Sequence, residues 1–340
     1  MYFILACALA AFILALVLTQ IARRLALSRS IVDVPNERSS HTEVVPRGGG
    51  LAIVTVFLVF LILFPVLNYY VGILFVAIGF ALLGWADDVY SLSAGTRLLV
   101  QGIIAIGAVV TIGEFEALEF AGIRISNASI CLLFTLIWVV WMVNLYNFMD
   151  GIDGIAGVET VVVATTMGIW FYKFGFNPNL LLLCWVLAAA SLGFLVFNWP
   201  PAKVFMGDVG SVSIGGVFAV LTIIGVNEYD IPLTAYIILL SIFISDSTLT
   251  LIRRLCKKEN IFRAHRSHYY QRAVIVGWSH KQVTLTVFIT NIVLAILGSM
   301  AAIRMSPEWL WPLLTVAVLC LLIATVIHRE RSPIRMSNMY

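Results

Sequence analysis

A short polar cassette between two long apolar stretches is the part of the chain best suited to chemistry. From Asn144 to Gly157 it reads Asn-Leu-Tyr-Asn-Phe-Met-Asp-Gly-Ile-Asp-Gly-Ile-Ala-Gly. Asn147, Asp150 and Asp153 recur at intervals of three, so a helical backbone places them near one face. Carboxylates and a carboxamide are costly to hold at a membrane helix, and they are retained mainly where they meet water, a cation or a polar substrate. We therefore expect the chemistry here.

Three further acids lie in two other short motifs. Asp87 and Asp88 are adjacent in Gly-Trp-Ala-Asp-Asp-Val-Tyr, and Asp208 lies in the segment Phe-Met-Gly-Asp-Val-Gly-Ser that begins at Phe205. Each motif has a structural alternative, because the Asp pair can end one helix and Asp208 can cap another. The functional interpretation of the Asp pair is an anchor for a cation. For Asp208 the two interpretations are compatible, since a helix N-terminus also favours phosphate.

Two basic loops leave a similar choice open. The loop at 253–282 contains His265-Arg266-Ser267-His268. No cysteine or acid completes a tetrahedral zinc site with these histidines at a familiar spacing. The alternatives are a solvated basic loop and a site where Arg and His bind a diphosphate.

The first loop, with Arg38 and His41, leaves the same two alternatives open. Its glycines, Gly48 to Gly50, are also explained by close packing at the start of the next helix. Asp246, within an apolar stretch, has Ser245, Ser247 and Thr248 around it. We expect Asp246 to be a hydrogen-bond centre satisfied by these neighbours, with a role in a substrate groove as the alternative.

Composition indicates a membrane protein. The 340 residues are 61% hydrophobic and 11% charged, with a mean hydropathy of +1.01. A spanning helix needs about 20 apolar residues. The sequence therefore predicts an all-α polytopic membrane protein, one integral membrane domain over 1–340, with about eleven transmembrane helices. The candidate spans are 3–21, 50–67, 70–85, 97–113, 128–146, 155–172, 179–197, 210–226, 233–251, 283–303 and 309–327.

The basic residues predict the orientation. With the N-terminus outside, 18 of the 21 Lys and Arg fall in cytoplasmic loops, which is a strong positive-inside bias. The C-terminus is then cytoplasmic, and the net charge of +3 reflects topology rather than nucleic-acid binding. The acids of all three motifs share the cytoplasmic face with the basic loops, which suits a magnesium-bound polyphosphate. The predicted cytoplasmic loops lie near 22–49, 86–96, 147–154, 198–209 and 252–282.

Taken together and in this order, the motifs resemble the polyprenyl-phosphate N-acetylhexosamine-1-phosphate transferases of glycosyltransferase family 4. The resemblance runs from residue 33 to about residue 283. It implies eleven helices and an active site at the cytoplasmic face of a bacterial inner membrane. The His-Arg-Ser-His form is more similar to enzymes that initiate O-antigen chains than to the peptidoglycan translocase, which has consecutive histidines. The matching stretches are 33–41 with 46–50, Asp87-Asp88 with Leu92 and Arg97, 144–157, 205–211 and the histidine loop.

The resemblance implies transfer of an N-acetylhexosamine-1-phosphate from a UDP-sugar to undecaprenyl phosphate, with release of UMP. The sugar would be GlcNAc or a 6-deoxy relative such as QuiNAc or FucNAc, and the product would initiate O-antigen (lipopolysaccharide) or related cell-surface glycan synthesis. The implied cofactor is Mg²⁺, with Mn²⁺ as an alternative, and the implied partners are membrane lipids and a second copy in a homodimer. The alternatives are the phospho-MurNAc-pentapeptide translocase and, from another class, a secondary transporter. Acids gathered at one face rather than at the midplane disfavour the transporter.

The resemblance also assigns roles in binding the metal and the nucleobase. Magnesium is expected on Asp208, with Asn147 or Asp150 completing the protein ligands, and Asp150 is also counted among the catalytic residues. Asp153 and Phe205 would hold the uracil, by a hydrogen bond and by ring stacking respectively.

Roles toward the phosphates follow in the same way. Asp87 and Asp88 would orient or deprotonate the lipid phosphate. A phosphate monoester has a second pKa of about 6, so it is already mostly dianionic at pH 7, and we favour positioning over proton transfer. A covalent aspartyl-phosphate route stays open as a rival. The remaining substrate and diphosphate contacts are expected from His265, Arg266, His268, Arg38, His41 and Asn144.

Overall fold

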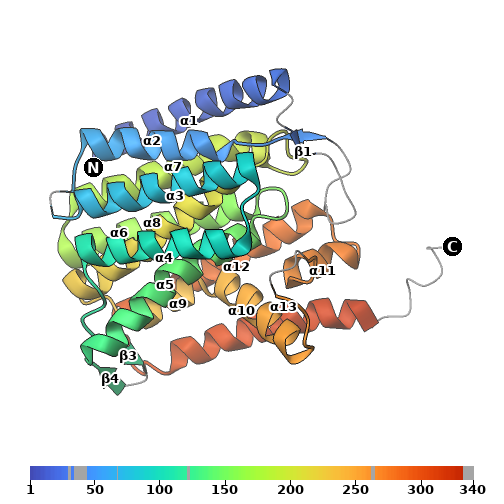
Figure 1. Ribbon diagram of the computed structural model, residues 1–340. Helices are drawn as coiled ribbons and strands as arrows, with labels where there is room; N and C mark the ends of the chain where they lie inside the picture. The colour runs from blue at the N-terminus through green and yellow to red at the C-terminus, as the bar shows by residue number, and fades with distance from the viewer. Residues whose placement is uncertain (30–31, 34–43, 67, 121–122, 262–264, 332–340) are drawn as a thin grey trace.

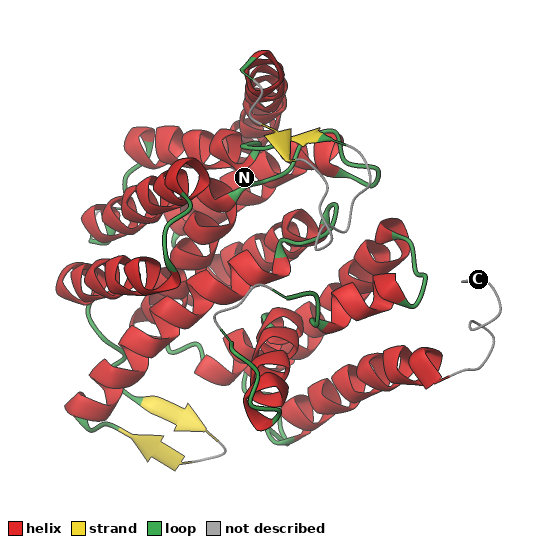
Figure 2. Ribbon diagram, turned by 45° about the vertical axis from the view of Figure 1, so that its right-hand side comes forward, coloured by secondary structure: helices red, strands yellow, loops and turns green. Residues whose placement is uncertain are grey.

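The computed structural model is a helix bundle with two small two-stranded sheets (Figures 1 and 2). It describes residues 1–29, 32–33, 44–66, 68–120, 123–261 and 265–331. Within these ranges, nine helices are long and apolar enough to cross a membrane. This confirms the predicted all-α polytopic membrane protein. The nine are α1 (Tyr2–Ser28), α3 (Tyr70–Tyr90), α4 (Ala94–Ile112), α5 (Ala128–Met149), α6 (Ile155–Gly175), α7 (Pro178–Asn198), α8 (Asp208–Tyr229), α12 (His280–Ala302) and α13 (Leu310–Arg331).

Two of the eleven predicted spans have a different form. The stretch at 50–67 folds into α2 (Gly50–Leu63), which at 14 residues is shorter than the roughly 20 that a span needs. It ends just before Pro65, since the residue preceding a proline is disfavoured in a helix. The stretch at 233–251 is split between α9 (Leu233–Leu239) and α10 (Ser241–Cys256), bent by 79°. Counting that pair as one broken span gives up to ten crossing helices among the described residues.

Helix α8 lies at the centre of the bundle. In its most apolar window 94% of the residues are buried, against 11% in α13. Small residues permit this packing: a Cβ on Gly215 would lie 2.6 Å from the backbone oxygen of Met142 in α5. A Cβ on Gly84 of α3 would lie 2.5 Å from the backbone of Asp208. Because α8 begins at Asp208, its burial carries that residue to the middle of one end of the bundle.

The two ends of the bundle carry different small elements. One end, here called the acid end, holds the C-terminal ends of α3 and α5 and the N-terminal end of α8, with α11 (Tyr269–Ile275) nearby. The other, the hairpin end, carries the antiparallel hairpin β3 (Leu118–Phe120) and β4 (Ile123–Ile125). In Figure 1, α1 begins at the left and α13 ends at the right, on the side of the acid end. This is the relation expected if the N-terminus is outside and the C-terminus cytoplasmic.

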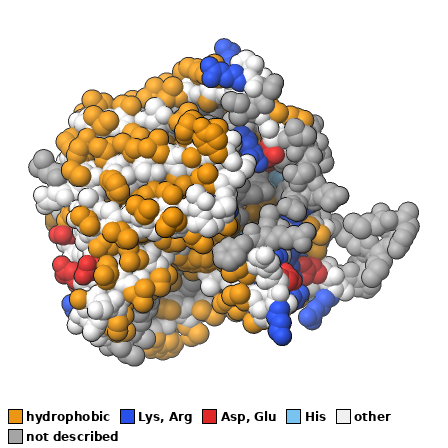
Figure 3. Space-filling model, in the orientation of Figure 1, with side chains coloured by type: hydrophobic (Ala, Val, Ile, Leu, Met, Phe, Trp, Pro, Cys, Tyr) orange, Lys and Arg blue, Asp and Glu red, His pale blue; other side chains and the backbone are white. Residues whose placement is uncertain are grey.

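The surface fits a membrane location. In the space-filling view, hydrophobic side chains cover the broad face between the two ends, and charged side chains gather near the ends (Figure 3). The outermost helices present large apolar side chains such as Leu9, Ile106 and Leu321 to the surroundings. A bilayer is the medium in which such exposure is favourable. The protein is therefore a multi-pass membrane protein.

Candidate active site

Three motifs that are far apart in the sequence meet at the acid end. Asp88, near the end of α3, accepts hydrogen bonds from the backbone N–H of Asp208 at 3.1 Å and of Val209 at 3.5 Å. Asn147, in the last turn of α5, donates from Nδ2 to Asp208 Oδ1 at 2.8 Å and to Ser211 Oγ at 3.2 Å. The structure thus brings together the Asp pair, the polar cassette and the segment that opens α8.

The two acids of the Asp pair have different partners. Asp87 is buried, with Oδ2 2.7 Å from Nη1 of Arg97 and Oδ1 accepting the backbone N–H of Leu92 at 2.8 Å. Asp88 instead caps α8, so a carboxylate, rather than a phosphate, occupies the first amides of that helix. The sequence analysis treated the two neighbours as equivalent, but they have different structural roles: Asp87 joins α3 to α4, and Asp88 holds the start of α8.

Negative charge is concentrated around Asp208. The negative charges of Asp87 and Asp88 both act on its carboxyl group. Ionised carboxylates that lie close together repel one another, so this cluster favours a shared proton or a cation. Asp150 follows α5 directly, and burial, together with the charges of Asp208 and Asp88, raises the pKa of its carboxyl group well above the usual range. The arrangement stores repulsion that a bound cation would relieve.

The donor set fits a divalent cation that is shared with a phosphorylated substrate. No group of three or more His, Cys, Asp or Glu side chains forms a metal-binding cluster among the described residues. Mg²⁺, however, usually takes one or two carboxylates and fills its remaining positions with water and substrate phosphates. Asp208 supplies such a carboxylate, and Asn147 would present its oxygen if its amide were turned over. Asp150 is the alternative second ligand.

The glycine segment of the first loop supports the start of α8. Phe205 N–H donates to the carbonyl of Pro46 at 2.9 Å, Gly49 N–H to that of Phe205 at 2.9 Å, and Gly50 N–H to that of Met206 at 2.8 Å. A Cβ on Gly50 would lie only 2.5 Å from Cα of Gly210. Close packing therefore explains these glycines, as the structural interpretation of the loop predicted.

Arg47 is a site residue of the first basic loop that the sequence reasoning did not place among the site residues. It pairs with Asp33 at 2.8 Å, and its guanidinium also interacts with the charges of Asp88 and Asp208. The only signal in the sequence was its place next to the glycines. The other residues predicted from this loop, Arg38 and His41, lie outside the described residues, and their binding roles stay predictions.

Asp153 is tied to the loop that ends at Phe205. Its Oδ2 accepts the backbone N–H of Ala202 at 3.0 Å. Buried Asn198 makes a second link, accepting from Gly154 N–H at 2.9 Å and donating to the carbonyl of Val204 at 2.8 Å. The cassette and the segment leading to Phe205 are thus held side by side, as a shared uracil site would require. The uracil contacts themselves stay predictions.

Asn144 has a partner in the neighbouring helix. Its Nδ2 donates to Oε1 of Gln101 at 2.7 Å and to the carbonyl of Val140 at 2.7 Å. The side chain therefore joins α4 to α5, one turn before Asn147. Its predicted role in substrate binding is not needed to explain this position.

Asp246 organises the histidine loop. Its carboxylate accepts the backbone N–H of Tyr269 at 2.8 Å and of Tyr270 at 2.9 Å, and lies 3.2 Å from Nδ1 of buried His268. This confirms Asp246 as a hydrogen-bond centre. Its partners are not the adjacent hydroxyls that the sequence indicated but Thr250 and the start of α11. Tyr270 completes the link to the cassette, because its hydroxyl donates to the carbonyl of Phe148 at 2.9 Å.

The two histidines of the loop lie together. Their ring centroids are 5.0 Å apart, and Nδ1 of His265 is 2.9 Å from Oγ of Ser267. Burial, and then the charges of His268 and two nearby arginines, lower the pKa of His265 to about 4. His265 is therefore neutral at pH 7 in the protein without substrate. Arg266, between the two histidines, carries the permanent positive charge of this motif.

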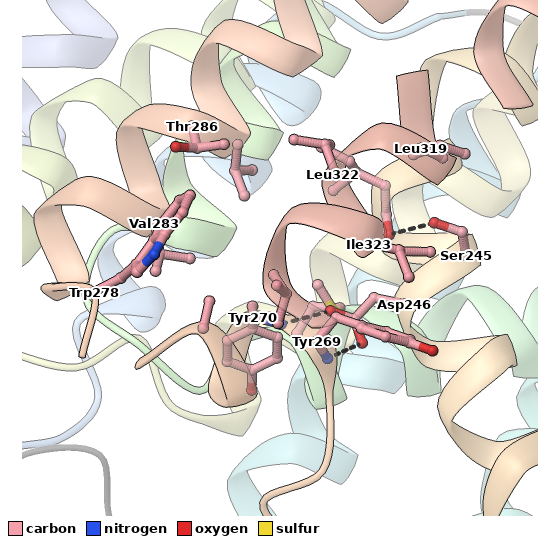
Figure 4. A pocket seen from close by; sticks show the side chains of 15 residues that line it. Ser245, Asp246, Tyr269, Tyr270, Trp278, Val283, Thr286, Leu319, Leu322 and Ile323 are labelled. Atoms are coloured by element: carbon pink, nitrogen blue, oxygen red, sulfur yellow. Dashed lines mark hydrogen bonds between the residues drawn. The ribbon is translucent and has the colours of Figure 1, made fainter. Parts of the chain in front are cut away.

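An apolar cavity adjoins this loop and the cassette (Figure 4). The space within it that water-sized molecules can occupy is about 90 Å³, and it lies among α10, α11, α12 and α13. Met149, the residue before Asp150, reaches it from α5. The other side chains that border it include Tyr270, Trp278, Val287, Leu319 and Leu322. The cavity is thus an apolar space next to a polar, negatively charged centre.

These features define a class of protein: a polytopic membrane protein in which carboxylates and an amide from distant motifs gather at one end of the helix bundle. Comparison with known proteins narrows this class. The model of glycosyl transferase family 4 matches residues 70–226, which include the Asp pair, the cassette and Asp208. Over this region the chain is similar to that family, and this similarity supports a phosphosugar transferase.

Curated relatives extend the match beyond that region. A probable undecaprenyl-phosphate N-acetylglucosaminyl 1-phosphate transferase of Bacillus subtilis is 29% identical, over 87% of this chain and 83% of its own length. The phospho-N-acetylmuramoyl-pentapeptide-transferase of Staphylococcus carnosus is 27% identical, over 86% and 97%. That of Thermotoga neapolitana is 28% identical, over 76% and 85%. The chain is thus similar to two kinds of transferase.

Proposed function

We propose that this protein transfers an N-acetylhexosamine-1-phosphate from a UDP-sugar to undecaprenyl phosphate, releasing UMP, at the cytoplasmic face of the bacterial inner membrane. The sugar would be GlcNAc or a 6-deoxy relative, and the product would begin an O-antigen or related surface glycan. The observation that carries this proposal is the meeting of Asp88, Asn147 and Asp208 at the start of α8. The Bacillus subtilis relative, named for this kind of transfer, supports it.

In the proposed reaction, an oxygen of the acceptor phosphate attacks the β-phosphorus of the UDP-sugar. The bond from that phosphorus to the bridging oxygen breaks, and UMP leaves with the electron pair. Catalysis of such a step is mainly positioning and charge stabilisation. Mg²⁺, held by Asp208 with Asn147 or Asp150, would neutralise charge on the diphosphate. Arg47 and Arg266 are the cations of this end that would approach the phosphates from the two basic loops.

Asp88 acts in this scheme as a positioning residue. Its carboxylate already accepts the first two N–H groups of α8 and so fixes the helix that begins with Asp208. An acceptor phosphate with a second pKa of about 6 needs little help to lose its proton at pH 7. Removing a proton would then contribute about tenfold at most, below the 10²–10⁴ of an effective general base. The geometry and this argument favour the same role.

The apolar cavity supports a lipid acceptor. Its wall includes Met149, so an isoprenoid chain in the cavity would place a phosphate head group near Asp150 and the other acids. Burial of apolar surface contributes about 0.8 kcal/mol per CH₂ group, which favours a long chain over a soluble acceptor. The polar head and the apolar tail would thus meet different parts of one continuous region.

A second candidate is the transfer of phospho-MurNAc-pentapeptide to the same lipid. The observation that favours it is the match to two pentapeptide transferases over three-quarters or more of this chain. Both candidates use the same acids and the same bond exchange, and they differ in the sugar. The histidine loop is the region that distinguishes them, because this chain has Arg266 and Ser267 between its two histidines.

The test is an assay of the purified protein with undecaprenyl phosphate, Mg²⁺ and a panel of UDP-sugars that includes UDP-GlcNAc, UDP-QuiNAc, UDP-FucNAc and UDP-MurNAc-pentapeptide. We expect UMP release and a lipid-linked sugar diphosphate with one of the first three. A preference for the pentapeptide donor would select the second candidate. Labelled UMP should not exchange into the UDP-sugar without lipid, since direct transfer needs both substrates together. Failure of every donor, with binding of none, would refute the transferase.

A further inference from the structure

His280 contacts Asp153 from a third part of the chain. It is the first residue of α12, and its Nδ1 lies 3.2 Å from Oδ1 of Asp153. Only 15% of the His280 side chain and 10% of the Asp153 side chain are exposed. Thr284, one turn later in α12, donates to the backbone carbonyl of Asp153 at 2.7 Å. The start of α12 therefore holds both the side chain and the backbone of this acid.

We propose that His280 is a positioning residue for the nucleobase of the donor: it fixes the Asp153 carboxylate as a hydrogen-bond acceptor that selects uracil. This inference rests on the proposed function, because it assumes that Asp153 meets the base of a UDP-sugar.

The contacts of Asp153 fix the plane of its carboxylate. One oxygen lies 3.2 Å from Nδ1 of His280, and the other accepts the backbone N–H of Ala202 at 3.0 Å. An ionised carboxylate has about four lone-pair positions and no proton, so it keeps acceptor capacity only. Uracil presents a donor at N3, whereas cytosine presents an acceptor there. A carboxylate held in one orientation would thus accept uracil and reject cytosine, and it would lose little rotational freedom on binding.

The start of α12 is itself rigid. Ser279 caps the helix: its Oγ accepts the N–H of Gln282 at 3.2 Å, and Gln282 Oε1 accepts the N–H of Ser279 at 2.9 Å. This reciprocal cap fixes the direction from which His280 reaches Asp153. An anion beside a helix N-terminus is also favourable. The position of His280 is therefore set by a helix rather than by a loose loop.

The test is donor and product affinity in variants of the purified full chain. His280→Ala, and His280→Leu as a second variant that preserves bulk, should raise the KM for the UDP-sugar and the inhibition constant of UMP by about tenfold, the loss expected for one close contact between an imidazole and a carboxylate. The kcat and the KM for undecaprenyl phosphate should stay within about twofold. The preference for UMP over CMP should fall. His280→Asn, whose amide nitrogen replaces Nδ1, should retain most of the preference for UMP over CMP.

Lys281→Ala is the matched control, because Lys281 is the adjacent residue and is exposed. An unchanged inhibition constant of UMP in both His280→Ala and His280→Leu would overturn the inference. An equal loss for UMP and CMP would also overturn it, since that is the result of a purely structural role. Asp153→Asn tests the uracil contact of Asp153 separately from the positioning role of His280. If Asp153→Asn shifts the preference toward CMP while His280→Ala changes nothing, only the inference about His280 fails. If the wild-type protein does not bind UMP, the proposed function fails as well.

Discussion

The two ends of the helix bundle treat their charged side chains in opposite ways. At the hairpin end, Arg304 pairs with both Glu119 at 3.4 Å and Asp230 at 3.1 Å, and Asp230 is largely exposed. At the acid end, the negative charges of Asp87 and Asp88 act on the carboxyl group of Asp208. The first arrangement neutralises charge in water, where an ion pair contributes about 0–1 kcal/mol. The second keeps like charges together where burial makes repulsion costly.

This difference separates charged residues that stabilise the fold from charged residues that are retained for binding a ligand. A set of acids that opposes folding persists only if something else needs it. Removing a charge at the hairpin end should have little effect. Removing an acidic charge at the acid end should stabilise the folded protein and lower its activity. The following predictions use that contrast, beginning with the largest effect.

Asp208→Asn should lower kcat by about 10³-fold or more, because a neutral amide replaces a carboxylate beside the reacting phosphate. The melting temperature of the purified variant should be unchanged or higher, since repulsion with Asp87 is relieved. UMP release and thermal unfolding in detergent measure the two effects. Asp230→Asn is the control at the hairpin end and should keep activity within about twofold. Near-normal activity of Asp208→Asn at limiting Mg²⁺ would contradict the assignment.

Asp246→Ala should reduce kcat/KM by about 30-fold and should also lower the melting temperature. The carboxylate accepts two backbone N–H groups at the start of α11 and lies against His268, so its removal leaves these groups buried without a partner. Losing a charged acceptor of this kind costs about 2 kcal/mol. Thr250→Val removes only the weaker contact at 3.3 Å and should change activity little. Equal effects of the two substitutions would show that Asp246 does not organise the loop.

His265→Gln should have the smallest effect at neutral pH, with activity within about threefold at pH 7.5. With a pKa of about 4 in the folded protein against an ordinary value of 6.5, His265 is neutral there, and glutamine preserves a neutral polar side chain. Below pH 6.5 the unfolded chain binds a proton that the folded protein resists, so the wild type should lose stability as the pH falls toward 4. His265→Gln should lose less. Parallel melting curves of the two proteins from pH 7.5 to 4.5 would argue against the lowered pKa.

Much of the fold could be predicted because it follows from local hydrophobicity. Each of the eleven apolar stretches is helical, and the acids of the three motifs lie at one end as the distribution of Lys and Arg predicted. The bend between α9 and α10 was missed because a hydropathy pattern records which residues are apolar and not the direction of the chain. The length of α2 was overestimated for the same reason, since the apolar run continues past Pro65 although the helix ends at Leu63.

The motifs of the site could be predicted, but their contacts could not. Asp88 reaches the amide of Asp208 across 120 residues, and Asp153 reaches His280 from another helix end. Such pairs depend on how helices pack, and no periodicity within either segment encodes them. Arg47 and His280 were given no specific role from the sequence because each stands apart from the other candidate residues, beside glycines or after a turn. Which residues bind metal, base and phosphate stays a prediction that the substitutions above would test.

The burial of α8 has a consequence for how the enzyme would respond to its membrane. Helices that face lipid, such as α13, meet changes in bilayer thickness by tilting or by drawing lipid with them. Helix α8 is surrounded by protein over 94% of its apolar window, so its neighbours absorb such changes before they reach it. The position of Asp208 along the axis of the bundle is thus set by contacts such as Gly84 against its backbone. The geometry of the reaction would then be the same in thin and in thick membranes. The path by which the lipid substrate reaches the site would differ between them.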